Sequence, residues 1–381
     1  MIKPMRRSML QDQILLPGGV TVRDPSGDRY VIEGLLGKGQ SGAVYLVRDR
    51  RRKQNLFALK EVIDPNRRDR ERFIFEGEIL KRLDHRALPH VYRVFEHDKL
   101  KRVYVLMDYI KGRNLETLRK EQPEQRFTLP LVLVLIAPIV DALIYLHCQD
   151  PPIVHRDIKP ANIIVPVGAD EAVLVDFGSA KEYVANAGTT TISRLTPGYA
   201  ALEQYGSGTI PRTDIYGLGA TLYTLLTGAV PLDAISRVTR SRNKGIDPLK
   251  PVHLLAPAVP TAVSQAIQRA MSLSSDDRFA TVEEFWQVLK DQATHQQANI
   301  PRVTSADTPQ ALSEQGIERN THVTKRWIVL PILLALLVTL ALGTRFVPLV
   351  WGLPILLLLC GGILLLLLFP WLHRSSSSKR T

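Results

Sequence analysis

Two short polar segments constrain this chain more than any other feature. The first is residues 155–162 (HRDIKPAN), and the second, residues 176–178 (DFG), begins 14 residues after Asn162. Asp157, Asn162 and Asp176 carry oxygen atoms suited to magnesium and to a substrate hydroxyl. Either segment alone is weak evidence. Together, in this order and at this spacing, they predict one site built from both.

A glycine cluster lies upstream, in residues 37–44 (GKGQSGAV). Gly37, Gly39 and Gly42 allow the backbone to approach phosphates closely and to donate N–H groups. Dinucleotide-binding loops use similar glycines, but those glycines open a helix. Here the β-branched and aromatic residues of Ala43–Val47 favour a strand. The cluster therefore predicts a flap between two strands, although an ordinary glycine turn stays open on this motif alone.

A lysine follows in the apolar run Leu56–Val62, which we predict to be a strand. Burial of Lys60 in such a strand costs free energy unless its ammonium is paired or binds an anion. The apolar spacing of Arg67–Leu83 predicts a helix, on which Glu76 is the candidate partner and Glu78 the competitor. A lysine held by a glutamate can bind phosphate oxygens as a fixed charge.

In this order, these segments resemble the protein kinase family, and more closely the bacterial serine/threonine kinases that share the eukaryotic fold. The resemblance covers roughly residues 28–292. It implies an α+β fold of two lobes, a small β-rich lobe over about 28–108 and a larger helical lobe over about 109–292. It also implies ATP and Mg²⁺ as cofactors, and serine and threonine hydroxyls of proteins as substrates. Lys159 matches the family's serine/threonine mark.

The resemblance assigns roles to individual residues. Asp157 would accept or orient the substrate hydroxyl, and Lys159 would neutralise charge on the transferring phosphoryl group. Lys60 would contact the phosphates and be held by Glu76, which precedes His85 by nine residues, the family's usual step. Asn162 and Asp176 would hold magnesium. The nucleotide would lie among Gly37, Gly39, Gly42, Val44, Ala58, Met107 (the gatekeeper) and the hinge Asp108–Ile110, with Asp108 and Ile110 at its ends.

Other matching residues would support the site. Thr196, in residues 196–199 (TPGY), would hydrogen-bond Asp157, and Asp214 would anchor the backbone of the 155–162 segment. The resemblance also implies that Arg156, which precedes Asp157, pairs with a phosphate on the segment between Asp176 and Glu203. The candidate autophosphorylation sites are Thr189, Thr190, Thr191 and Ser193.

One departure from the family's pattern concerns the substrate loop. The family has Ala-Pro-Glu where this chain has Ala201-Leu202-Glu203. Glu203 is kept, so its ion pair with Arg278 is expected to survive. The φ constraint of proline is lost. The departure puts the rigidity of the substrate loop in doubt, but not the phosphate site.

Two other functions compete with an active protein kinase. One is a catalytically weak pseudokinase that binds nucleotide and serves as a scaffold at the membrane. The other is a small-molecule phosphotransferase on the same fold. Residues 196–203 argue against the second, because they match the loop that receives a peptide.

An apolar run of 18 residues, Leu129–Leu146, is long enough to cross a bilayer. Its single charge, Asp141, would cost about 2.5–3.5 kcal/mol at the centre of a membrane helix. We therefore expect a buried helix in the larger lobe. Cys148, just after it, invites a nucleophilic role, but we expect a small buried side chain.

The C-terminal region differs sharply from the rest. Residues 327–372 are almost wholly apolar and too long for one crossing, so we expect two transmembrane helices, 327–344 and 348–369, joined by a turn at Arg345. Lysine and arginine flank their outer ends, which places both ends in the cytoplasm. The expected arrangement is a multi-pass plasma-membrane protein that contacts membrane lipid through this hairpin. The remaining segments are an N-terminal extension without an export signal (1–27), a flexible linker (293–324) and a basic polar tail (370–381).

Composition narrows the partners. The chain has a formal net charge of +12 and two cysteines, which excludes a disulfide scaffold or multi-cysteine metal site and fits a reducing compartment. A basic run, residues 48–53 (RDRRRK), falls between two predicted strands. No nucleic-acid motif accompanies it, so we expect a solvated hairpin tip and no nucleic-acid partner. The resemblance leaves a homodimer open.

Overall fold

The structure is a computed structural model, in which the chain separates into two units, residues 1–303 and 304–381. It describes residues 15–39, 42–51, 55–63, 67–97, 101–168, 171–177, 180–183, 195–206 and 208–298. The predicted membrane helices 327–344 and 348–369 lie outside the described residues, so they stay predictions.

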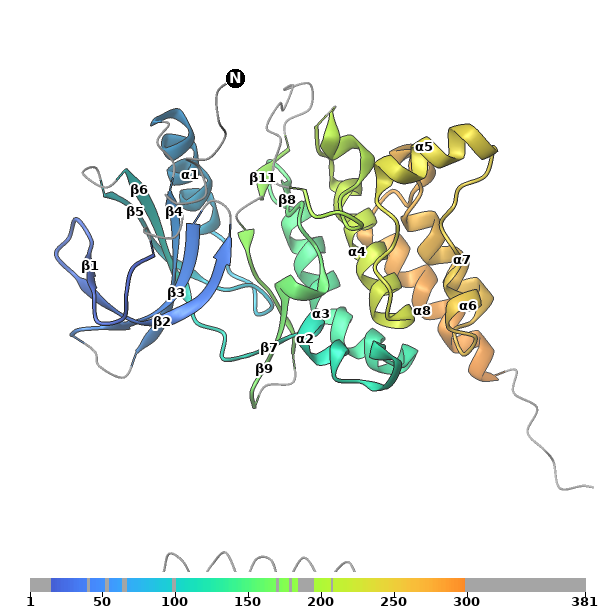
Figure 1. Cartoon of the computed structure of the whole chain (residues 1–381), viewed down its shortest axis with the longest axis horizontal. Helices are drawn as coiled ribbons and strands as arrows, with labels where there is room; N and C mark the ends of the chain where they lie inside the picture. Colours follow the sequence, from blue (N-terminus) through green and yellow to red (C-terminus); the bar gives the residue numbers. More distant parts are fainter. Residues whose placement is uncertain are drawn as a thin grey trace, which may run out of the picture. The chain divides into compact units, whose positions relative to one another are not determined.

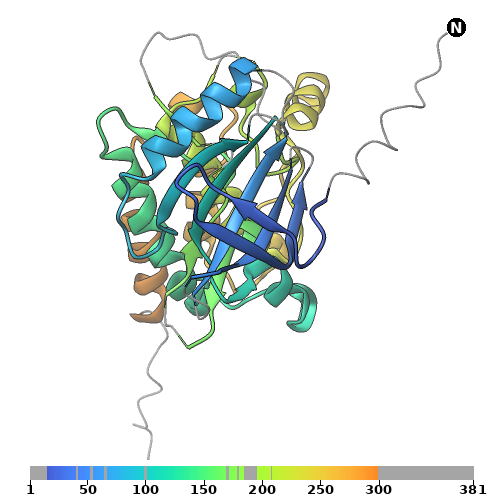
Figure 2. The same cartoon turned by 90° about the vertical axis from the view of Figure 1, so that its left-hand side faces the viewer.

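The smaller lobe is one antiparallel sheet with a helix against it (Figures 1 and 2). Its strand order is β1-β2-β3-β4-β6-β5, and α1 contacts β5 and β6. The predicted strands and the predicted helix are present, although the helix ends at Leu80 rather than Leu83. The elements are β1 (Thr21–Arg23), β2 (Arg29–Gly39), β3 (Gly42–Asp49), β4 (Leu56–Ile63), α1 (Arg67–Leu80), β5 (Val91–His97) and β6 (Arg102–Asp108).

The first strand lies upstream of residue 28, where we expect the kinase-like region to begin. β1 pairs with β2, with Thr21 opposite Val31. Val22 is buried in a cluster formed by alternate residues of the sheet, and Leu15 and Leu16 pack against the same cluster. The chain before residue 28 therefore covers one face of the sheet.

A buried carboxylate lies on that covered face. The Glu61 side chain is fully buried and accepts hydrogen bonds from the hydroxyls of Tyr45 and Tyr104 at 3.0 and 2.9 Å. Arg102 Nη1 adds an ion pair at 2.6 Å. A charge is tolerated in such a place only when it is paired and hydrogen-bonded. Because consecutive residues of a strand point to opposite faces, Lys60 points to the other side of the sheet.

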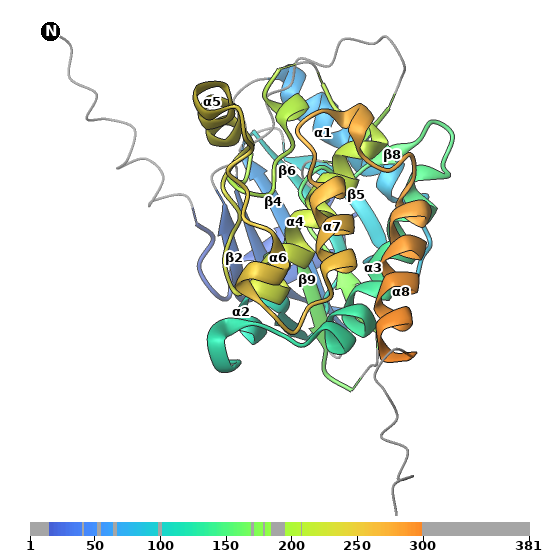
Figure 3. The same ribbon diagram turned by 90° about the vertical axis from the view of Figure 1, so that its right-hand side faces the viewer.

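The larger lobe is mainly helical (Figures 1 and 3). Its helices are α2 (Leu115–Lys120), α3 (Leu129–His147), α4 (Pro211–Thr227), α5 (Ala234–Lys244), α6 (Val252–Leu255), α7 (Thr261–Ala270) and α8 (Val282–Ala298). Its short strands are β7 (Gly112–Asn114), β8 (Ile153–Val154), β9 (Ile163–Pro166), β10 (Val173–Leu174) and β11 (Lys181–Glu182), and its 3₁₀ turns are η2 (Pro123–Gln125), η3 (Pro160–Asn162), η5 (Leu202–Tyr205) and η6 (Ser275–Asp277).

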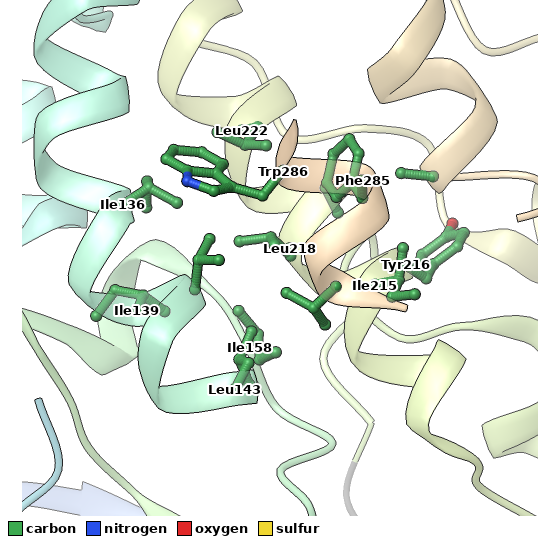
Figure 4. Packing of buried hydrophobic residues seen from close by; sticks show 14 of the residues in the cluster. Ile136, Ile139, Leu143, Ile158, Ile215, Tyr216, Leu218, Leu222, Phe285 and Trp286 are labelled. Atoms are coloured by element: carbon green, nitrogen blue, oxygen red, sulfur yellow. The ribbon is translucent and has the colours of Figure 1, made fainter. Parts of the chain in front are cut away.

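Helices α3, α4 and α8 form the core of this lobe (Figure 4). Ile139 and Leu143 of α3 are fully buried together with Leu218 of α4 and Phe285 of α8. Among the described residues, α3 is the helix long and apolar enough to cross a membrane by length and composition. Its packing against α4 and α8 confirms the prediction of a buried core helix.

Two predictions need correction. Cys148 is exposed rather than buried, because it is the C-cap of α3, where the helix leaves the core. Helix α8 continues to Ala298, six residues into the predicted linker 293–324. Alanine and glutamine in residues 293–298 (ATHQQA) are good helix formers and prolong α8. The rest of that segment lies outside the described residues.

Candidate active site

The predicted catalytic aspartate lies in a closed network of polar side chains. Lys159 Nζ donates to both carboxylate oxygens of Asp157 at 2.9 and 2.7 Å, and also to Thr196 Oγ1 at 2.8 Å. Thr196 Oγ1 in turn donates to Asp157 Oδ1 at 2.8 Å, so the expected hydrogen bond is present. Asn162 Nδ2 donates to Asp157 Oδ2 at 3.0 Å. These contacts fix the carboxylate in one orientation.

The backbone beneath this network is held by Asp214 of α4. Its Oδ2 accepts from the His155 amide and its Oδ1 from the Arg156 amide, both at 2.8 Å. This is the anchor that the sequence predicts. His147 Nε2, at the end of α3, also lies 2.9 Å from Asp214 Oδ2. No sequence pattern indicates this role of His147, because its partner lies on a helix and is 67 residues away in the chain.

The histidine of the same loop is buried among acidic residues. His155 is fully buried, and burial lowers its pKa, against the opposing effect of Asp214, Asp157 and Asp176. Its ring also packs edge-on against Phe177, with ring centroids 5.0 Å apart. His155 therefore lies buried between the two polar segments, and its Nδ1 accepts from the Asp157 amide at 3.4 Å.

The two predicted magnesium residues come from adjacent segments. The Val175 amide donates to the Asn162 carbonyl at 2.8 Å, which joins the segment before Asp176 to η3. Both hydrogen bonds of Asn162 Nδ2 go to Asp157, so the acceptor atom of this amide is Oδ1. Magnesium in nucleotide enzymes uses one or two protein oxygens, with phosphates and water completing the shell. An amide oxygen and a carboxylate here fit that requirement.

Lys60 of β4 reaches the opposite wall of the site. Its Nζ lies 2.5 Å from Asp176 Oδ1, which brings together the two lobes of the site. The competitor Glu78 forms an ion pair with Lys81 at 2.9 Å instead. Glu76 lies in α1, but its side chain is outside the described residues, so its pairing with Lys60 stays a prediction.

The glycine cluster joins β2 to β3, as predicted. Gly37 lies opposite Val44, and Gly39 opposite Gly42, while residues 40 and 41 are outside the described residues. A Cβ at Gly42 would lie 1.7 Å from the Glu61 carbonyl oxygen of β4. Glycine is therefore required there by the close approach of the neighbouring strand.

The predicted adenine residues share one face of the sheet with Lys60. In the strand registers, Val44 lies opposite Lys60, and Ala58 lies opposite Met107. Side chains directly opposite one another point to the same face, so these four line the side of the sheet that carries Lys60. The sequence prediction and the sheet register therefore select the same face.

The predicted hinge starts where β6 ends. Asp108 Oδ1 accepts from the Tyr92 hydroxyl at 2.7 Å, and Oδ2 from the His90 amide at 3.0 Å. The hydrogen bond to Asp108 raises the pKa of Tyr92 to about 12. Ile110 follows in the segment before β7 and is partly exposed. Tyr92 and His90 thus hold the start of the hinge, a role the sequence did not reveal.

The predicted pair of Glu203 and Arg278 is bidentate, at 2.7 and 2.9 Å. The Arg278 side chain is fully buried and also donates to three backbone carbonyls. Thr213 donates to Glu203 Oε1 at 2.9 Å. The carboxylate that follows Leu202 is therefore fixed to α4 and to the segment before α8. The candidate phosphorylation sites Thr189, Thr190, Thr191 and Ser193 lie outside the described residues.

Comparison with known proteins places this geometry in context. The protein kinase domain family matches residues 30–285. Serine/threonine-protein kinase PknJ of Mycobacterium tuberculosis is 33% identical over 266 residues, which is 67% of this chain and 44% of PknJ. Serine/threonine-protein kinase PknD of Chlamydia trachomatis is 28% identical over 300 residues, 69% of this chain and 31% of PknD. The chain thus spans less than half the length of either relative.

The crystal structure of the Mycobacterium tuberculosis PknI kinase domain aligns with a TM-score of 0.57 at 27% identity, covering 73% of this chain and all of that one.

Proposed function

The chain belongs to the protein kinase domain family, and on this basis we propose that it transfers the γ-phosphoryl group of ATP to serine and threonine hydroxyls of proteins. The network of Asp157, Lys159, Thr196 and Asn162 carries the proposal, because it aligns a carboxylate beside a fixed ammonium. Positioning and charge neutralisation are the main demands of phosphoryl transfer.

Each residue of the site has a part in this reaction. Asp157 accepts the proton of the incoming hydroxyl or orients it, and Lys159 neutralises charge that develops on the transferring group. Lys60 binds phosphate oxygens, and Asn162 and Asp176 hold magnesium. Bound Mg²⁺ supplies positive charge to the phosphates. Thr196 keeps the Asp157 carboxylate in place, and the sheet face with Val44, Ala58 and Met107 receives the adenine.

Transfer from labelled ATP to a mixture of serine and threonine peptides tests the proposal, with the full chain and its Asp157→Asn variant. The amide cannot accept the proton, so the variant is expected to be slower by about 10²–10⁴-fold. If the natural chain binds ATP but transfers nothing, the pseudokinase scaffold is the better description. If only small molecules are phosphorylated, the chain is a small-molecule phosphotransferase.

Activation by autophosphorylation belongs to the same proposal. Arg156 is buried directly before Asp157, and we propose that its guanidinium pairs with a phosphate on the segment between Asp176 and Glu203. We expect at least one of four residues to be modified in the active enzyme, and mass spectrometry that finds all of them unmodified would contradict this. These residues are Thr189, Thr190, Thr191 and Ser193.

Membrane attachment is the last part of the proposal. The apolar segments 327–344 and 348–369 would cross the bilayer as a hairpin, with both outer ends and the kinase domain in the cytoplasm. A tag after Thr381 should then be protected from an impermeant reagent in intact cells. Labelling of that tag would favour a single crossing with an external tail.

A further inference from the structure

The backbone around Leu202 already has the geometry that proline imposes. Ala201 has φ −72° and ψ 156°, the extended conformation expected of a residue before proline. Leu202 is the first residue of η5, the position in a helical turn where proline is most easily accommodated. Another contact must therefore hold this turn in place of the missing ring.

Gln204 makes that contact. Its side chain is buried, and both ends of its amide are bonded to backbone atoms. Oε1 accepts from the Ala201 amide at 2.9 Å, which closes η5 at its first residues. Nε2 donates to the Arg156 carbonyl at 2.9 Å, which joins η5 to residues 155–162, the catalytic loop. One side chain thus fixes the turn and ties it to the residue before Asp157.

The hydrogen bond from Gln204 is accepted by Arg156, whose backbone conformation is unfavourable. Arg156 has φ 74°, in the left-handed region that residues other than glycine rarely adopt. Asp214 holds the Arg156 amide at 2.8 Å, and Gln204 holds its carbonyl. The residue is therefore held on both sides, and Gln204 supplies one of the two contacts.

Thr196 makes the matching attachment at the other end of the loop. It bonds Asp157 Oδ1, so residues 196–204 meet the catalytic loop through Thr196 and again through Gln204. Glu203 does not take part in this, since its carboxylate is bonded to Arg278 and Thr213.

We propose that Gln204 is a positioning residue that holds the substrate loop, residues 196–204, against the catalytic loop and supplies the constraint that proline provides elsewhere in the family. The inference rests on the proposed kinase activity, because the loop matters only if it receives a peptide. Gln204 acts through the backbone of Ala201 and Arg156 and does not touch the reacting atoms.

The test is a steady-state comparison of the full chain with its Gln204→Glu variant. Glutamate keeps an acceptor for the Ala201 amide but places an oxygen against the Arg156 carbonyl. We expect the KM for a peptide substrate to rise about tenfold, the value of one buried hydrogen bond, while the KM for ATP changes less than about twofold. Gln149→Leu is the matched control, because Gln149 donates to the Tyr145 carbonyl at the end of α3.

A second substitution tests the link to proline. Leu202→Pro in the Gln204→Glu background is expected to restore a large part of the peptide KM, because a proline at 202 favours the extended conformation that Ala201 already has. A rescued peptide KM supports the proposal. An unchanged peptide KM in Gln204→Glu, or equal losses for peptide and ATP without rescue, would overturn it.

Hydrogen exchange keeps the two proposals separate. The Ala201 amide should exchange faster in Gln204→Leu than in the natural chain, whether or not the protein transfers phosphate. An inactive natural chain with faster exchange in the variant would contradict only the proposed function. Unchanged exchange at residues 196–204 would contradict only the role of Gln204.

Discussion

The candidate active site has two walls that are held in different ways. The helical wall carries Asp157 and its partners, and the sheet wall carries Lys60 and the glycine cluster. In the helical lobe, Asp157 is bonded to Lys159, Thr196 and Asn162, and buried groups support the loop from below. In the sheet lobe, Lys60 reaches across to Asp176, and residues 35–38 of β2, which include Gly37, are exposed. The buried polar network of that lobe, around Glu61, lies on the opposite face of the sheet.

This difference separates two tasks. The wall proposed to orient the substrate hydroxyl is held by hydrogen bonds between protein groups, which would preserve the alignment that phosphoryl transfer requires. The wall proposed to bind the phosphates presents the exposed glycine-rich end of β2 and the ammonium of Lys60. Substitutions in the helical wall should therefore affect both stability and activity, whereas those in the sheet wall should affect activity alone.

The largest expected effect is on stability, from Arg278→Met in the helical wall. It leaves the Glu203 carboxylate, 11% exposed, without its guanidinium, and we expect the free energy of unfolding to fall by about 3–5 kcal/mol. Urea unfolding followed by tryptophan fluorescence measures this. Arg86→Met is the control, because its side chain is 60% exposed and its ion pairs are worth less than about 1 kcal/mol. Equal losses in the two variants would break the comparison.

Lys60→Met tests the sheet wall. The methionine keeps most of the volume but cannot bind phosphate oxygens, so we expect phosphoryl transfer to fall by at least about 10²-fold. The free energy of unfolding should stay within about 0.5 kcal/mol of the natural chain. Lys81→Met, which removes a surface pair with Glu78, should leave both quantities unchanged. Normal turnover in Lys60→Met would mean that another lysine binds the phosphates.

The smallest effect is the pH dependence of stability, which sharpens the view of the helical wall. Burial lowers the pKa of His155 in the folded chain, whereas in the unfolded chain it titrates near 6.5. The unfolded state therefore binds the proton first, and stability is complete above pH 6.5 and falls below it, by about 1 kcal/mol per pH unit. Unfolding measured between pH 7.5 and 5.5 should show this slope. A slope just as steep in His155→Phe would assign it to other groups.

The sequence predicted the parts of the site whose residues stand close together in short segments. Asp157, Lys159 and Asn162 lie within six residues, and their spacing alone places them in one loop. The pairing of Glu203 with Arg278 followed from the family resemblance. Strands β3 and β4 and helix α3 were predicted from apolar and β-branched patterns, which indicate the burial of long elements.

The other features of the site and the fold depend on tertiary contacts, which produce no recognisable sequence pattern. Gln204 and His147 are ordinary polar residues in the sequence, and their partners are a carbonyl and a carboxylate brought near by folding. The exposure of Cys148 depends on where α3 leaves the core. β1 is only three residues long and is recognisable only by its pairing with β2.

Whether α3 crosses the membrane determines whether the number of crossings is odd or even. Among the described residues α3 has the length and composition of a membrane span, and 327–344 and 348–369 are the two predicted spans. An odd number would put the two sides of the chain in different compartments, and it would leave Lys60 and Asp176, which flank α3, separated by a hydrocarbon layer about 30 Å thick. Their contact at 2.5 Å forbids this. The proposed crossings are therefore the predicted segments 327–344 and 348–369, an even number, so the proposal places the chain beyond residue 369 on the same side of the membrane as Lys60 and Asp176.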